Sequence, residues 1–164
     1  MHRRAPRPRF PRRFAFRETR ISPTRQFLQG AAAAGAVDGV LAALSFDRDG
    51  LIAAVAQQHD TGEVLMLAWM NRQAIDETLK SGQVCYWSRS RNALWRRGET
   101  SGQAQSLVEL RIDCDNDCLL LLVDQSGVAC HTGRRSCFFT AIRAGEVKTI
   151  GAVLVDPAQL YAAR

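Results

Sequence analysis

Residues 106 to 137 read SLVELRIDCDNDCLLLLVDQSGVACHTGRRSC, and this stretch combines two strand-like runs with many metal-binding side chains. The runs cover 106–112 and 118–124, and each is of strand length and rich in apolar or β-branched residues. The same stretch holds three aspartates at alternate positions and four of the chain's five cysteines. A fold does not need this much metal-binding chemistry for its stability, so the stretch predicts both a β-rich core and a functional site.

The three aspartates form a candidate site for a hard cation. Side chains alternate between two faces along extended backbone. If the strand over 106–112 continues, Cys114 lies on its apolar face and the polar face carries Asp113, Asp115 and Asp117. Carboxylates on one face repel one another unless a cation lies among them, and Mg²⁺ prefers such oxygen ligands. A solvated acidic strand face or loop is the alternative.

Three cysteines are candidate zinc ligands, namely Cys114, Cys130 and Cys137. Thiolates select zinc, and three protein ligands leave the open coordination position that is typical of catalytic zinc. Taken singly, a cysteine is most often a small core residue, which is the interpretation we keep for Cys85 and Cys118. The odd number of cysteines and the lack of a convincing secretory signal favour metal binding over disulfides.

An alternation of hydroxyl and guanidinium groups lies upstream, at Ser88, Arg89, Ser90 and Arg91. Each guanidinium can bind two oxygens of a phosphate at once. Glycines at positions 98 and 102 would let backbone amides approach an anion. The segment therefore predicts a phosphate site, with a solvated hairpin of ordinary surface charge as the alternative.

The rest of the body consists of short strand-like runs and one clear helix. Further strands are expected over 51–56, 63–69, 84–88 and 137–143. A helix is expected over 72–81, with Asn71 as its N-cap and Gly82 at its stop. These elements predict a β-rich α+β fold, a single compact domain with a small mixed, barrel-like sheet and one main helix.

Most of the positive charge lies in the first 20 residues. They hold eight arginines and one glutamate, whereas the remaining 144 residues hold 14 basic and 15 acidic side chains. The nearly neutral body does not predict a nucleic-acid partner, and no apolar run is long enough to cross a membrane. We expect residues 1–40 to be a disordered basic extension and residues 41–164 to form the domain. A targeting segment or a start codon assigned too far upstream is the alternative.

Five blocks of the sequence, between about residues 50 and 139, resemble the phosphoribosyl-AMP cyclohydrolase family of histidine biosynthesis. The blocks are LMLAWMN at 65–71, YWSRSRNALW at 86–95, RGETSG at 97–102, DCDND at 113–117 and ACHTGRRSCFF at 129–139. The resemblance implies an intertwined homodimer. It also implies that magnesium binds the three aspartates and that zinc is shared across the dimer by Cys114, Cys130 and Cys137.

The reaction that the resemblance implies is hydrolytic opening of the adenine ring of N1-(5-phosphoribosyl)-AMP between N1 and C6, which gives the formimino aminoimidazole carboxamide ribotide. His131 is the first candidate for proton transfer and Glu99 the second. The implied substrate-binding residues are Ser88, Arg89, Ser90, Arg91, Thr100 and Ser101.

The resemblance further implies a cytoplasmic enzyme with a single activity, because the 25 residues after Phe139 are too few for the helical domain fused to some relatives. Arg97 stands where the family commonly has lysine, and Cys118 where it commonly has alanine. Two rival functions remain. One is a zinc-stabilised binding module whose arginine-rich extension contacts RNA or an acidic partner, and the other is a nucleobase deaminase, whose paired Cys-x-x-Cys is missing here.

Overall fold

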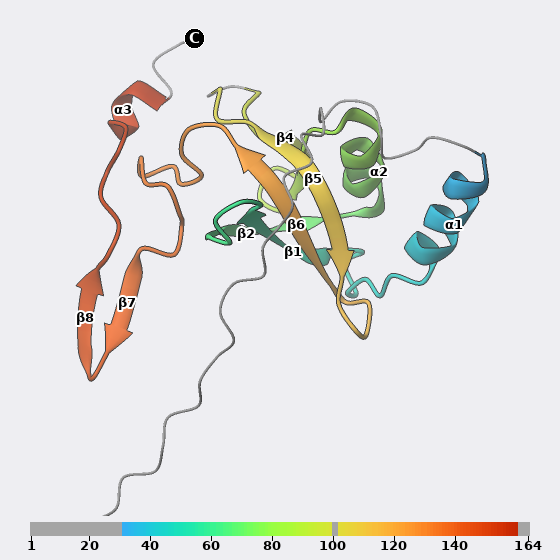
Figure 1. Cartoon of the computed structure of the whole chain (residues 1–164), viewed down its shortest axis with the longest axis horizontal. Helices are drawn as coiled ribbons and strands as arrows, with labels where there is room; N and C mark the ends of the chain where they lie inside the picture. The colour runs from blue at the N-terminus through green and yellow to red at the C-terminus, as the bar shows by residue number, and fades with distance from the viewer. Residues whose placement is uncertain (1–30, 100–101, 161–164) are drawn as a thin grey trace, which may run out of the picture.

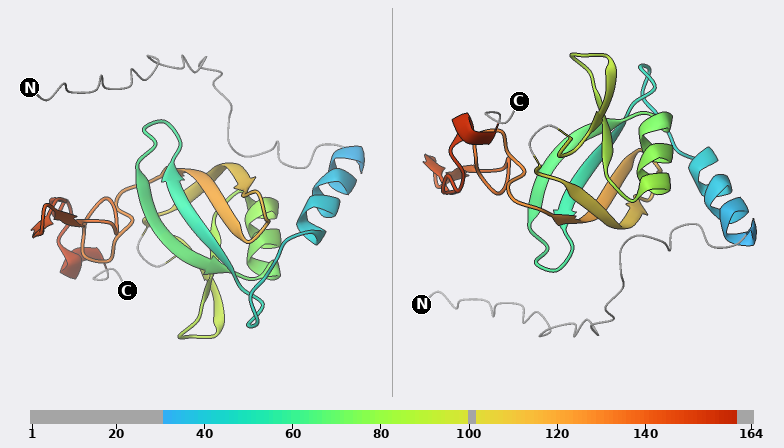
Figure 2. Two further views of the ribbon diagram at one scale, coloured as in Figure 1. Left: turned by 90° about the horizontal axis from the view of Figure 1, so that it is seen from below. Right: turned by 90° about the horizontal axis from the view of Figure 1, so that it is seen from above.

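A curled six-stranded sheet forms the centre of the molecule (Figures 1 and 2). The computed structural model describes residues 31–99 and 102–160. The strand order is β4-β3-β2-β1-β6-β5, and the central pair β1 and β6 is parallel whereas the other neighbours are antiparallel. The strands are β1 (Ile52–Gln58), β2 (Val64–Met70), β3 (Cys85–Ser88), β4 (Ala93–Arg96), β5 (Gln105–Ile112) and β6 (Cys118–Gln125). The predicted β-rich α+β class with a mixed sheet is confirmed.

The curl brings the edge strand β5 back toward the start of β3. Backbone hydrogen bonds join Val84 N to the Gln105 carbonyl at 2.9 Å and Leu107 N to the Gly82 carbonyl at 2.8 Å. The sheet is therefore a half-barrel rather than an open layer. The fully buried apolar side chains of the core include Ile52, Leu65, Met70, Leu107, Leu119 and Leu121 from the sheet and Ile75 from the helix that covers it.

Helix α2 (Arg72–Ser81) packs on the sheet beside β2 and β3. The Asn71 side chain accepts a hydrogen bond from Ala74 N at 2.8 Å, and Gly82 ends the helix with a φ of 71°. Both caps and both ends of the helix confirm the sequence prediction. Thr78, buried on the inner face, accepts a 2.9 Å hydrogen bond from Cys85 N and so fixes the helix to β3.

Part of the predicted disordered extension is helical. Helix α1 (Ala31–Ala42) covers the last residues of the 1–40 segment, while residues 1–30 lie outside the described residues. Alanine has the highest helix propensity, and burial of Leu41 fixes the end of the helix to the core. Among the described residues, no helix is both long and apolar enough to cross a membrane.

A β-bulge in β5 changes the predicted register. The pairing with β6 shifts between Leu107 and Glu109, so Val108 is exposed while Leu107 is buried. Beyond the bulge, Leu110 and Ile112 are half-buried while Arg111 between them is exposed. Strand β5 also ends at Ile112 rather than continuing through the aspartates.

The C-terminal part forms an arm that stands away from the half-barrel (Figure 1). It contains β7 (Thr140–Arg143), β8 (Glu146–Thr149) and the short helix α3 (Pro157–Leu160). The strand expected over 137–143 begins only at Thr140, because Cys137 N instead bonds the Leu65 carbonyl at 2.7 Å. Within the described part of the chain, strands β7 and β8 pair only with each other, and Ile142 and Val147 are 77% and 70% exposed.

Candidate active site

The three aspartates gather in the turn between β5 and β6. Each of Asp113, Asp115 and Asp117 offers a carboxylate oxygen, and these oxygens lie within 4.8 Å of one another. The cause is turn geometry and not the predicted strand alternation, because Asn116 has a φ of 65° and reverses the chain. The Asp113 carboxylate accepts hydrogen bonds from the backbone N of Asp117 at 3.0 Å and of Cys118 at 3.1 Å.

Crowding of like charges separates the pKa values of two of these carboxyls. Desolvation opposes ionisation of Asp113, but hydrogen bonds from the Cys118 backbone and from Asp117 hold its pKa below the usual value. The pKa of Asp117 is raised, first by its hydrogen bond to Asp113 and then by the neighbouring negative charges. A divalent cation would relieve this repulsion, so the donor set fits a hard metal such as Mg²⁺.

Two of the three predicted zinc ligands lie together in the loop after β6. Cys130 is 3% exposed, and its Sγ lies 3.0 Å from the Thr132 hydroxyl. Hydrogen bonds from Ala129 N to the Arg135 carbonyl and from Cys130 N to the Arg134 carbonyl, both 3.0 Å, close the loop. Because of this closure, Cys137 returns to the neighbourhood of Cys130.

The thiols of Cys130 and Cys137 interact, and their pKa values move apart. Burial opposes ionisation of Cys130, but hydrogen bonds with Thr132 and Cys137 hold its pKa below the usual value. Desolvation and the adjoining Cys130 raise the pKa of Cys137 to about 11. Two neighbouring thiols in a partly buried loop are suited to a thiophilic metal such as zinc.

Cys114 is not part of this pair. It is exposed in the aspartate turn, and the three aspartates are the only cluster of three or more potential metal ligands among residues 31–99 and 102–160. One chain therefore brings together two of the predicted zinc ligands but not the third. Cys85 is buried, as expected for a core residue, whereas Cys118 is only half-buried.

The two candidates for proton transfer occupy different loops. His131 is exposed and directly follows Cys130. Glu99 is exposed in the loop after β4, where its carboxylate lies 3.9 Å from Arg96 Nη1. His131 is therefore beside the cysteine pair by its position in the chain.

The predicted phosphate segment forms the turn between β3 and β4. Arg91 Nε donates to the Ser88 hydroxyl at 3.2 Å, and the hydroxyls of Ser88 and Ser90 are 3.5 Å apart. The Arg89 guanidinium lies over the Trp69 ring, 4.9 Å from its centroid. The turn thus presents hydroxyl and guanidinium donors together. Thr100 and Ser101, the other predicted binding residues, lie outside the described residues.

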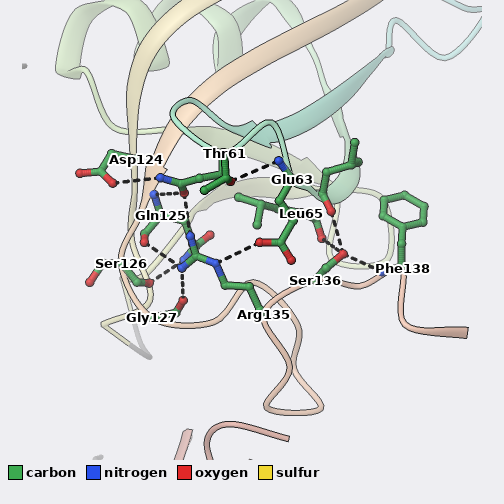
Figure 3. A network of polar contacts seen from close by, with 12 residues as sticks. Thr61, Glu63, Leu65, Asp124, Gln125, Ser126, Gly127, Arg135, Ser136 and Phe138 are labelled. Carbon is green, nitrogen blue, oxygen red and sulfur yellow. Dashed lines mark hydrogen bonds and ion pairs between the residues drawn. The ribbon is translucent and has the colours of Figure 1, made fainter. Parts of the chain in front are cut away.

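Sequence reasoning missed two arginines that hold the cysteine loop. Arg97 donates hydrogen bonds to the carbonyls of Val128 and Ala129, directly before Cys130. Arg135 donates hydrogen bonds to residues at the ends of two strands, β6 and β1 (Figure 3). The pair of arginines in HTGRRSC was visible, but the sequence gives no sign of partners that are up to 77 positions away.

The fold and the site together define a single β-rich domain that carries a carboxylate cluster and a cysteine loop. The family model described as "Phosphoribosyl-AMP cyclohydrolase" matches residues 66–139. A Granulibacter bethesdensis protein of that name is 67% identical over 119 residues, which are 72% of this chain and 93% of the relative. A Rhodospirillum centenum protein of the same name is 65% identical over 125 residues, 76% of this chain and 94% of the relative. The chain therefore belongs to the phosphoribosyl-AMP cyclohydrolase family and is an enzyme of the hydrolase class.

Proposed function

We propose that this enzyme opens the adenine ring of N1-(5-phosphoribosyl)-AMP by hydrolysis of the N1–C6 bond. The product is the formimino aminoimidazole carboxamide ribotide of histidine biosynthesis, and the reaction takes place in the cytoplasm. The observation that carries the proposal is the 67% identity to a protein named phosphoribosyl-AMP cyclohydrolase over 93% of that protein.

Magnesium is assigned to Asp113, Asp115 and Asp117. Their carboxylate oxygens already lie within 4.8 Å of one another, and the raised pKa of Asp117 indicates that the metal-free cluster is electrostatically crowded. Zinc is assigned to Cys130 and Cys137 of one subunit together with Cys114 of the partner subunit. The support is that Cys130 and Cys137 adjoin, whereas Cys114 is exposed in a separate turn.

A homodimer is part of the proposal, because one chain alone supplies only two of the three thiols. The arm of β7 and β8 supports it, since Ile142 and Val147 lie exposed on strands that pair with no other strand among the described residues. Large apolar side chains grouped on a protruding element are typical of a surface that a second chain covers.

The residues have separate tasks in the proposed reaction. Bound zinc would supply an activated water as the nucleophile for C6. His131, directly after a zinc ligand, would deliver a proton to N1 as the ring bond breaks, and Glu99 is the second candidate. Ser88, Arg89, Ser90 and Arg91 would bind one substrate phosphate, with Thr100 and Ser101 completing that site.

The test is turnover of N1-(5-phosphoribosyl)-AMP by the purified protein with zinc and magnesium, followed by the ultraviolet absorbance of the product. Ring opening that stops on chelation, without release of ammonia, is the expected result. Release of ammonia would instead indicate a nucleobase deaminase. A folded, zinc-loaded protein that shows no turnover but binds RNA in a salt-sensitive manner would favour the binding-module alternative.

A further inference from the structure

The side chain of Arg135 joins the cysteine loop to the rest of the half-barrel (Figure 3). Its Nη1 donates to the carbonyls of Gly127 at 2.9 Å and of Gln125 at 3.3 Å, at the end of β6. Its Nη2 donates to Gln58 Oε1 at 2.9 Å, at the end of β1. The guanidinium fork thus fixes two neighbouring strand ends to one point of the loop.

The acceptor Gln58 is itself held rigidly. It is buried, and its Oε1 also accepts a 3.1 Å hydrogen bond from the backbone N of Gln125. Gln125 is buried too, and its side chain donates to the carbonyls of Ser126 and Ala104. A buried and satisfied network of this kind has little freedom to rearrange, so it transmits a defined position to Arg135.

Hydrogen bonds of Arg135 and of the next residue hold the backbone beside both cysteines. The Arg135 carbonyl accepts from Ala129 N at 3.0 Å, which fixes the residue before Cys130. The next residue, Ser136, donates its hydroxyl to the Val64 carbonyl at 2.7 Å, and Cys137 follows it. Arg135 therefore lies where the two halves of the loop meet, between the segments that carry the two thiols.

Glu63 is a fourth partner of a different kind. Its carboxylate lies 3.5 Å from Arg135 Nε, and both side chains remain partly exposed. An exposed ion pair contributes little to stability because solvent screens it. The three neutral acceptors set the orientation of the fork, and a lysine could not satisfy them together because its ammonium lacks the planar fork.

We propose that Arg135 is a positioning residue for zinc, which acts by holding Cys130 and Cys137 at the separation that the metal requires. The inference rests on the proposed zinc assignment. In this role Arg135 acts through its contacts with Gln58 and Gly127, which fix the loop. Outer partners that orient metal ligands commonly change metal affinity when they are removed.

The test compares Arg135→Lys with the matched control Glu63→Gln, which removes the charged partner but leaves the neutral acceptors. Zinc affinity is measured on the full chain by competition with a chromophoric chelator, at a temperature where circular dichroism shows both variants folded. We expect zinc affinity to fall about tenfold in Arg135→Lys and to change less than about twofold in Glu63→Gln. After saturation with zinc, kcat should remain lowered in Arg135→Lys while KM is little changed.

Zinc affinity in Arg135→Lys within twofold of wild type would overturn the proposal, and so would an equal loss in both variants. If Arg135→Lys does not fold, Gln58→Met replaces it, since this substitution removes one acceptor of the fork. We then expect a several-fold weakening of zinc binding, and unchanged affinity would overturn the proposal. Failure of the wild-type protein to bind zinc would overturn the zinc assignment itself, which distinguishes the two failures.

Discussion

The hydroxyl of Tyr86 donates a 2.7 Å hydrogen bond to Gln105 Oε1 across the seam where the half-barrel curls back on itself. Both residues are fully buried, and Gln105 Nε2 continues the network to Gln125 Oε1 at 2.8 Å. Burial raises the pKa of Tyr86, so the phenol keeps its proton and remains a donor. The seam between β3 and β5 is therefore closed by side chains as well as by backbone.

Tyr86→Phe removes this donor and leaves Gln105 Oε1 buried without it. We expect the free energy of unfolding to fall by about 1–3 kcal/mol, the usual cost of an unsatisfied buried polar atom. The ring still packs against Trp95, and the two ring centroids lie 5.7 Å apart. A loss of stability would therefore be due to the missing hydroxyl and not to a cavity. Urea unfolding measures the change, and unaltered stability would show that the hydrogen bond is not needed at the seam.

Gly133 in the cysteine loop has a φ of 75°, and a Cβ there would overlap the carbonyl oxygen of Val155. The Gly133 carbonyl also accepts hydrogen bonds from Leu154 N at 2.8 Å and Val155 N at 3.2 Å, so the clash falls where the C-terminal segment attaches. Gly133→Ala should therefore destabilise the protein by more than the approximately 1–2 kcal/mol that a left-handed backbone alone costs.

Gly145→Ala is the matched control for this substitution. Gly145 has a φ of 82° in the β7–β8 turn, but a Cβ there meets nothing within 4 Å. Thermal unfolding of both variants measures their losses of stability, and the difference between these losses is the cost of the steric clash beyond that of the left-handed backbone. Equal losses in the two variants would mean that the C-terminal segment moves away from the loop without a measurable penalty.

The candidate site shows what the sequence could predict and what it could not. The grouping of the three aspartates was predicted for the wrong reason, because a turn gathers them where a continuous strand was expected. The turn depends on the positive φ of Asn116, a conformation that the local sequence permits but does not require. The residues of the cluster were therefore predictable, whereas its backbone was not.

The predicted features of the fold likewise have local causes, whereas the features that were not predicted depend on distant segments. The helix Arg72–Ser81 was predicted with both caps, since its signals are contained within a few residues. The bulge beside Val108 and the contacts of Arg135 with Gln58 arise from segments that meet only in three dimensions. No periodicity within one segment carries that information.

Glu77 on α2 and Arg96 on β4 form an ion pair with a 2.8 Å contact, and the hydrogen bond from Arg96 holds the pKa of Glu77 below its usual value. A carboxyl with a lowered pKa in the folded state stabilises the fold above the unfolded pKa, and this contribution is lost as pH falls through the folded value. We therefore expect Glu77→Gln to be less stable than wild type near neutral pH, with the difference vanishing in acid. Unfolding temperatures measured from pH 7 to pH 2.5 check the profile, and a difference that persists at the acid end would contradict it.

The proposed sharing of zinc between subunits can be tested by complementation. Cys114→Ala and Cys130→Ala should each lack zinc and turnover, because each removes a thiol from every site. A hybrid dimer of the two restores one complete site, with Cys130 and Cys137 from one subunit and Cys114 from the other. Random exchange of subunits should therefore recover about a quarter of wild-type activity.

Mixing Cys130→Ala with Cys137→Ala is the control, since every site in that hybrid still lacks a ligand. Equal recovery in both mixtures, or none in either, would show that the zinc site is not divided between chains in this way.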